Sequence, residues 1–117
     1  MHQSIKIFHN PRCSKSRQTL ELIRQQGIEP EVIEYLKTPP TISELKDILT
    51  RLNMEPRQLM RTKEAEYKEN NLDSDKLSNE ELIKAMVKNP KLIERPIVIN
   101  HQKVALGRPP ENVLEIL

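Results

Sequence analysis

The pattern of the first 36 residues constrains the fold more than any other feature of this sequence. Residues 4–8 alternate polar and apolar side chains, and residues 31–36 form a second short run that is β-branched at its centre. Between them, residues 14–26 carry apolar side chains at helical spacing, and Gly27 is suited to end that helix. A strand, a helix and a strand in so short a stretch form a right-handed crossover with two parallel strands. The sequence therefore predicts an α/β fold.

The middle of the chain predicts a mostly helical insertion at about residues 38–94. Two capping-box signatures, each a Thr or Ser followed three residues later by Glu, begin at Thr41 and Ser78. Pro56 is suited to the first turn of a shorter helix between them. The polar stretch 62–76 is expected to hold short helical pieces and turns.

The last part of the chain returns to β-structure and ends in a helix. Residues 96–99 and 104–106 predict a hairpin that turns at 100–103, and a final helix begins at 109–110. The apolar residues of this helix that should face the core are Val113, Leu114 and Leu117. Together the segments predict a four-stranded mixed sheet with a helical insertion, and we expect residues 1–117 to form one domain.

The composition excludes several classes of protein. One cysteine among 117 residues rules out an intramolecular disulfide framework and zinc sites built from several cysteines, and three scattered histidines predict no metal site. The formal net charge is only +2, and the chain has one Phe, two Tyr and no Trp, so we expect no nucleic acid partner. With no signal peptide and no apolar run near the roughly 20 residues of a membrane span, the sequence predicts a cytoplasmic protein without a membrane partner.

Cys13 stands between a strand and a helix, after the loop formed by residues 9–12. Unpaired backbone N–H groups and the positive end of the helix dipole favour a thiolate at such a position, so the pKa of this thiol should be lowered. Ser16 lies one turn further on, where its hydroxyl could donate a hydrogen bond to the sulfur. A buried structural cysteine is the alternative, and the local sequence leaves both interpretations open.

Other kinds of cysteine enzyme fit the spacing less well. A Cys-x-x-Cys oxidoreductase needs a second cysteine where Ser16 stands. A cysteine phosphatase needs an arginine six residues after its cysteine, and this chain has Thr19 there. His9 could be the base of a Cys-His-Asn hydrolase, but nothing in the sequence fixes that arrangement.

Three arginines stand at boundaries between predicted elements: Arg61, Arg95 and Arg108. Arg95 and Arg108 each precede a proline, which holds their backbone extended, and the Arg95–Pro96 peptide could be cis. Guanidinium groups match the geometry of a tetrahedral oxyanion, so three of them near one thiolate would form an anion site. The alternative is that each arginine is solvated or pairs with a carboxylate at the surface.

Four segments of the sequence together carry a family resemblance. They are His-Asn-Pro-Arg-Cys-Ser-Lys-Ser-Arg at 9–17, Tyr-Leu-Lys-Thr-Pro-Pro at 35–40, Arg-Pro-Ile-Val at 95–98 and Gly-Arg-Pro at 107–109. In this order they resemble the glutaredoxin-dependent arsenate reductases, over nearly the whole chain. The resemblance implies a thioredoxin-like fold with a helical insertion. The charged Arg12 and Lys15 beside the cysteine resemble a less-characterised branch of that family, since reductases of arsenic-resistance operons more often have small residues there.

The resemblance also implies a mechanism and roles for named residues. The Cys13 thiolate would attack arsenate and form a covalent arsenic adduct on its sulfur. The three residues that would bind the arsenate oxygens are Arg61, Arg95 and Arg108. The three supporting residues are His9 and Ser16, which would help to keep the thiol ionised, and Asn10, which would shape the loop around the oxyanion.

The resemblance further implies two thiol partners and no bound cofactor. Glutathione, as co-substrate, would attack the adduct, and glutaredoxin would resolve the resulting mixed disulfide. The single cysteine agrees with this, because the chain has no second thiol with which to resolve its own sulfur. Two alternatives remain: a regulator of this fold that binds RNA polymerase, although such regulators often carry a Cys-x-x-Cys pair, and a glutathione-linked thiol transferase acting on another substrate.

Overall fold

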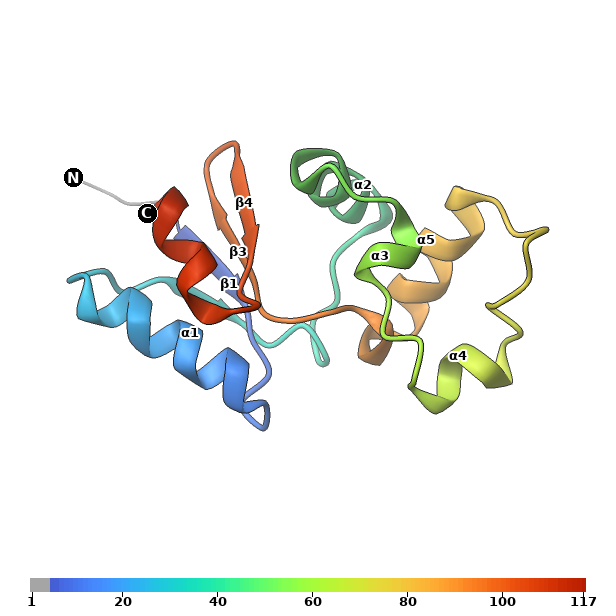
Figure 1. Ribbon diagram of the computed structural model, residues 1–117, viewed down its shortest axis with the longest axis horizontal. Helices are drawn as coiled ribbons and strands as arrows, with labels where there is room; N and C mark the ends of the chain where they lie inside the picture. The colour runs from blue at the N-terminus through green and yellow to red at the C-terminus, as the bar shows by residue number, and fades with distance from the viewer. Residues whose placement is uncertain (1–4) are drawn as a thin grey trace. The chain divides into compact units, whose positions relative to one another are not determined.

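The computed structural model describes residues 5–117, which form eleven elements in the order that the sequence predicts (Figure 1). The four strands are β1 (Ile5–Phe8), β2 (Glu31–Ile33), β3 (Ile97–Asn100) and β4 (Lys103–Leu106). The α-helices are α1 (Ser14–Gln25), α2 (Ile42–Leu52), α3 (Pro56–Leu59), α4 (Ala65–Glu69) and α5 (Asn79–Lys88). Two 3₁₀ helices complete the chain, η1 (Pro90–Leu92) and η2 (Pro110–Ile116).

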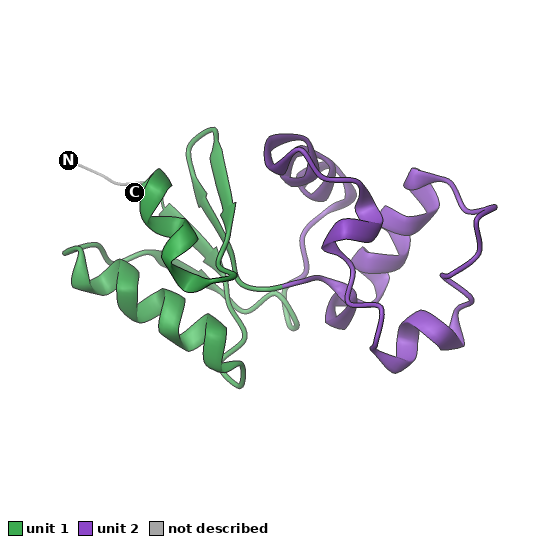
Figure 2. Cartoon of the chain, viewed as in Figure 1, with its two compact units in different colours: residues 1–38, 95–117 green, residues 39–94 purple. Residues whose placement is uncertain are grey.

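The chain forms two compact units (Figure 2). The first, here called the α/β unit, runs up to Thr38 and resumes at Arg95–Leu117, while the second, the helical unit, is Pro39–Glu94. The boundaries agree within one residue with the insertion predicted at 38–94. A single domain over residues 1–117 stays a prediction.

The sheet of the α/β unit has the strand order β2-β1-β3-β4. β1 pairs with β2 in parallel, and β3 is antiparallel to both β1 and β4. The prediction of a four-stranded mixed sheet that begins with a strand–helix–strand crossover is therefore confirmed. Ser4, which the sequence places in the first strand, lies outside the described residues.

The core of the α/β unit forms where the sheet meets α1 and η2. Alternate residues of β1, Ile5 and Ile7, point into it, while Lys6 between them is exposed. The buried residues of this cluster are Ile5, Ile7, Leu20, Ile23, Ile28, Val98 and Val113. Each buried aliphatic side chain stabilises the fold by roughly 1.5–3 kcal/mol relative to an exposed one. The core thus fixes α1 on the sheet, with its first turn beside the end of β1.

Two predicted elements differ from the structure. β2 ends at Ile33 rather than at residue 36, because the N–H groups of Lys37 and Thr38 both bond to the Glu34 carbonyl and turn the chain. The final helix is a 3₁₀ helix, in which the side chains repeat every three residues. Val113 is buried as predicted, but the prediction that Leu114 faces the core is wrong, since it is 40% exposed.

The helical unit is organised by helix caps. Thr41 and Ser78 accept the backbone N–H of the Glu three residues later, and in both cases that Glu accepts the backbone N–H of the cap, as the sequence predicts. α2 and α3 pack against α5. Arg57 of α3 donates to the Tyr67 hydroxyl and to two backbone carbonyls beyond α4, which ties the polar stretch to the rest of this unit.

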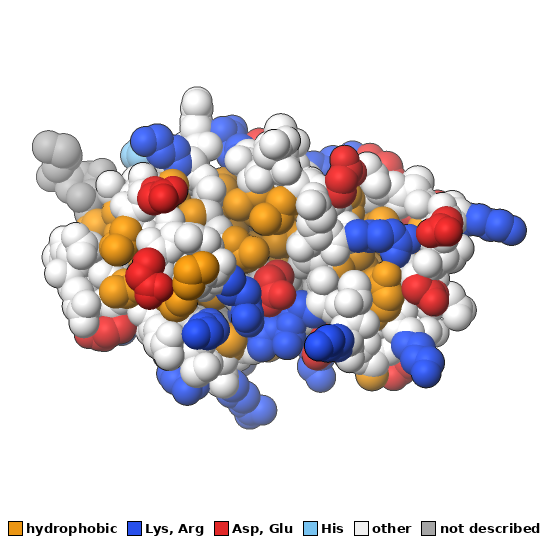
Figure 3. All heavy atoms as spheres, in the orientation of Figure 1, with side chains coloured by type: hydrophobic (Ala, Val, Ile, Leu, Met, Phe, Trp, Pro, Cys, Tyr) orange, Lys and Arg blue, Asp and Glu red, His pale blue; other side chains and the backbone are white. Residues whose placement is uncertain are grey.

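The surface carries charge of both signs. Figure 3 shows Lys and Arg side chains interspersed with Asp and Glu side chains over the face in view, in keeping with the small net charge. Among residues 5–117, no helix combines the length and the apolar character that crossing a membrane requires.

Candidate active site

A tight turn delivers Cys13 to the start of α1. The Cys13 N–H donates to the Asn10 carbonyl at 3.0 Å, and the Arg12 N–H donates to the Asn10 side-chain oxygen at 3.0 Å. Asn at the first and Pro at the second position favour such a turn, and the Asn side chain reinforces it from within. Arg17 holds the same loop from α1, since its guanidinium donates to the Pro11 carbonyl at 2.9 Å. Asn10 therefore shapes the loop that precedes the cysteine.

Cys13 is the N-cap residue of α1 and is largely buried, with 8% of its surface exposed. Burial by itself raises the pKa of the thiol. The Ser16 backbone N–H, the charge and hydrogen bond of the Arg95 guanidinium, and the Lys15 backbone N–H together outweigh burial, and the pKa of Cys13 is lowered. The expectation of a thiol activated at a helix N-terminus is thus supported by its surroundings.

His9 and Ser16 form a buried pair behind the cysteine. The Ser16 hydroxyl lies 2.6 Å from Nδ1 of His9 and also accepts the Asn10 N–H at 3.0 Å. The sequence indicates that the Ser16 hydroxyl could donate to the sulfur, whereas in the structure this hydroxyl bonds His9 and Asn10, and it is the Ser16 backbone N–H that lowers the pKa of Cys13. Burial lowers the pKa of His9, with Glu34 opposing this effect, so the neutral imidazole is favoured.

Arg95 and Arg108 lie on neighbouring turns at one end of the hairpin. Ile97 of β3 pairs with Leu106 of β4. Two residues further along each segment, the same register places Arg95 opposite Arg108. The Arg108 Nε–H donates to the Arg95 carbonyl at 2.9 Å. The peptides from Arg95 to Pro96 and from Arg108 to Pro109 are both cis. The two arginines therefore meet at one end of the hairpin, and forked guanidinium donors there suit an oxyanion.

Gly107 and Thr19 support this end of the site, and sequence reasoning did not assign them a part in it. A Cβ on Gly107 would lie 2.6 Å from Oγ1 of Thr19 and 2.7 Å from Cγ of Pro96. Thr19 is fully buried, and its hydroxyl donates to the Lys15 carbonyl at 2.8 Å. The sequence did hold a signal, because the chain has only two glycines and this one directly precedes a candidate site arginine.

Arg61 belongs to the helical unit. Its guanidinium lies 3.6 Å from a carboxylate oxygen of Glu64 and 3.8 Å from one of Glu94. Its backbone N–H donates to the Leu92 carbonyl, which fixes the backbone just after the bridge between Met60 and Ile93. Within the α/β unit, the Arg95 guanidinium lowers the pKa of Cys13 and the Arg95 carbonyl accepts a hydrogen bond from Arg108. The roles of Arg95 and Arg108 as oxyanion ligands, and that of Arg61, stay predictions.

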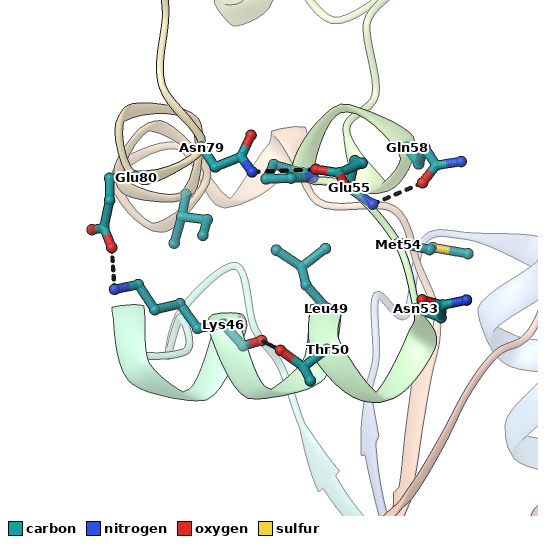
Figure 4. A pocket seen from close by; sticks show the side chains of 11 residues that line it. Lys46, Leu49, Thr50, Asn53, Met54, Glu55, Gln58, Asn79 and Glu80 are labelled. Carbon is teal, nitrogen blue, oxygen red and sulfur yellow. Dashed lines mark hydrogen bonds and ion pairs between the residues drawn. The ribbon is translucent and has the colours of Figure 1, made fainter.

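Two hollows are lined by residues other than Cys13 and the three candidate arginines. One, of about 680 Å³, opens among α2, α3 and α5, with the Lys46–Glu80 ion pair at one end, the Glu55–Asn79 hydrogen bond at the other and Leu49 between them (Figure 4). The second, of about 440 Å³, runs along α1 and η2 and includes Arg17. In the part of the chain from residue 5 onward, no three His, Cys, Asp or Glu side chains gather as a metal site would require.

The comparisons with known proteins agree with the fold. Residues 8–116 match the ArsC family. The chain is 57% identical to the uncharacterized protein YfgD of Escherichia coli K12, over 100% of this chain and 99% of that protein. It is 52% identical to an arsenate reductase of Neisseria meningitidis, covering 97% of each. A solved structure named arsenate reductase from Vibrio cholerae superposes with a TM-score of 0.96 at 52% identity, covering 100% of both chains. The chain therefore belongs to the ArsC family.

Proposed function

We propose that this protein reduces arsenate to arsenite through a covalent adduct on Cys13. One observation carries the proposal: the sulfur receives backbone N–H groups at the start of α1 together with the Arg95 guanidinium, and its pKa is lowered. A thiolate is the nucleophilic form of cysteine, and a cation beside it attracts an oxyanion to the point of attack. Relatives that share about half of the sequence are named arsenate reductases.

The reaction balances with one thiol from the protein and one from solution. The Cys13 thiolate forms a sulfur–arsenic bond, and one arsenate oxygen leaves as water. Glutathione then attacks, and arsenic takes up two electrons and leaves as arsenite, while the two sulfurs are oxidised to a mixed disulfide. A second thiol donor, a glutaredoxin with further glutathione, reduces this disulfide and restores Cys13. We expect this cycle in a reducing compartment such as the cytoplasm.

Arg95 and Arg108 are the residues that we propose to bind the arsenate oxygens, together with Arg61 from the helical unit. Forked guanidinium groups pair with two oxygens at once and offset the negative charge that develops as the thiolate attacks. His9 and Ser16 would keep their supporting roles by holding the loop before α1. No bound cofactor is needed, since glutathione carries the electrons.

The test is arsenate-dependent oxidation of NADPH, coupled through glutathione reductase, glutathione and glutaredoxin. We expect turnover that depends on arsenate, on glutathione and on Cys13, with Cys13→Ser as the inactive control. Oxidation that proceeds equally well without arsenate would indicate a thiol transferase instead. A wild-type protein no faster than Cys13→Ser would refute the proposal.

Arg95→Lys tests the binding of the oxyanion. Lysine keeps the positive charge but lacks the fork, so most of the activity should be lost while the fold is kept. Arg24→Lys is the matched control, because Arg24 pairs with Glu29 at the far end of α1. Wild-type turnover in Arg95→Lys would remove Arg95 from the site.

A further inference from the structure

The turn that follows β4 holds the turn that precedes β3 through two hydrogen bonds. The Gly107 N–H donates to the Pro96 carbonyl at 2.9 Å, and the Arg108 Nε–H donates to the Arg95 carbonyl at 2.9 Å. The first bond continues the hairpin ladder by one residue. The second comes from a side chain and holds the Arg95 carbonyl at a position where the antiparallel ladder itself has no backbone hydrogen bond. The backbone of Arg95 is therefore fixed from the opposite strand by the Arg108 guanidinium.

While the Arg95 carbonyl is held by Arg108, the Arg95 side chain acts on Cys13. Its guanidinium lies beside the sulfur, where its positive charge and its N–H donors lower the pKa of the thiol. A hydrogen bond of this kind needs the guanidinium at one position, and the position of a side chain depends on the backbone that carries it. The carbonyl held by Arg108 belongs to the same residue whose side chain contacts the sulfur. Arg108, Arg95 and Cys13 thus form one chain of contacts within the α/β unit.

We propose that Arg108 is a positioning residue, which fixes the Arg95 guanidinium beside the Cys13 sulfur by holding the Arg95 carbonyl. The bond uses Nε–H, a donor that lysine lacks at that point of the side chain. A guanidinium has five N–H donors, so one side chain can serve a carbonyl and an oxyanion together. The inference deepens the proposed function, and rests on it only in taking Cys13 as the reacting group.

The test measures the thiolate without arsenate. The rate of alkylation of Cys13 by iodoacetamide is followed against pH, in wild type, Arg108→Met and Arg108→Lys, with Arg24→Lys as control. If Arg108 positions Arg95, the midpoint of the Cys13 titration should move to higher pH in both Arg108 variants. At pH values below that midpoint, both variants should be alkylated several-fold more slowly than the wild type. Arg24→Lys should follow the wild-type profile. A loss in Arg108→Met that Arg108→Lys restores would mean that charge alone matters, and would overturn the proposal.

A second background separates positioning from a direct effect. In Arg95→Met the guanidinium that Arg108 is proposed to place is gone, so adding Arg108→Met should leave the alkylation profile unchanged. If adding Arg108→Met to Arg95→Met moves the alkylation midpoint as far as Arg108→Met moves it in the wild type, Arg108 acts on the thiolate itself and the inference is refuted. Circular dichroism identifies any variant that fails to fold, and Arg108→Gln then replaces it. Because no arsenate is used, failure here is distinct from failure of the reductase assay.

Discussion

Replacing Gly107 by Ala should disturb both the stability of the α/β unit and the reactivity of Cys13. The new Cβ would lie 2.6 Å from Oγ1 of Thr19 and 2.7 Å from Cγ of Pro96, and both distances are under the 3.0 Å that real Cβ atoms keep. Neither neighbour yields easily, since the Thr19 hydroxyl is bonded to the Lys15 carbonyl and the proline ring is stiff. The backbone must therefore move.

The expected size of the effect follows from overpacking in a closed site. Insertion of a methyl group where none fits costs about 1–3 kcal/mol. A loss of about 2 kcal/mol lowers the Tm by roughly 8 °C for a chain of this length. Because Gly107 also holds the Pro96 carbonyl, the movement displaces Arg95 and slows alkylation of Cys13.

Gly27→Ala is the matched control. A Cβ on Gly27 would meet nothing within 4 Å, but its φ of +78° is costly for alanine, by about 1 kcal/mol. This variant should lose stability and keep the wild-type alkylation profile. Thr19→Ala, which removes Oγ1, should partly restore the stability of Gly107→Ala. The reasoning is refuted if Gly107→Ala melts like wild type, or if both glycine variants change Cys13 reactivity alike.

Two further predictions concern His9 and Arg57. Because burial lowers the pKa of His9 from 6.5, the unfolded chain binds more protons below that pH, and the free energy of unfolding should fall as the pH drops below about 6.5. Denaturant titrations at pH 7 and about pH 5.5 measure this, and an equally steep fall in His9→Asn would assign the effect to other groups. Arg57→Lys loses donors to the Tyr67 hydroxyl at 2.7 Å and to the Leu72 and Ser74 carbonyls at 2.5 Å, at a cost of about 1–3 kcal/mol. Amide hydrogen exchange should then accelerate over residues 67–74, and unchanged exchange there would contradict the prediction.

The parts of the fold that the sequence predicts well are those set by local rules. Thr41 and Ser78 begin helices because a side-chain cap and a Glu three residues later satisfy backbone N–H groups of the same turn. Gly27 follows the end of α1 with a positive φ, as expected of a glycine that terminates a helix. The crossover and the hairpin predict the pairs β1–β2 and β3–β4, while the pairing of β1 with β3 that joins them comes from the structure.

The parts that it predicts poorly depend on contacts between distant segments. Leu114 has the spacing of a core residue in an α-helix, but the tighter 3₁₀ helix turns it outward. A spacing of one turn suggests a bond from the Ser16 hydroxyl to the sulfur, but the hydroxyl bonds His9 instead, and His9 comes from the end of β1. That Arg108 bonds the Arg95 carbonyl depends on the register of the hairpin, which spacing alone does not give.

The hairpin of β3 and β4 also restricts how the length of this chain can change. Successive side chains of a strand face opposite ways, so one residue inserted within β4 would reverse every following position up to Arg108. Replacement of His101, whose φ is +56°, by Asn or Gly leaves the register intact and suits the left-handed backbone. In diverging or engineered sequences this turn should therefore accept residues that suit a left-handed backbone, whereas a single insertion or deletion within β4 should be accepted only at the expense of the cysteine site.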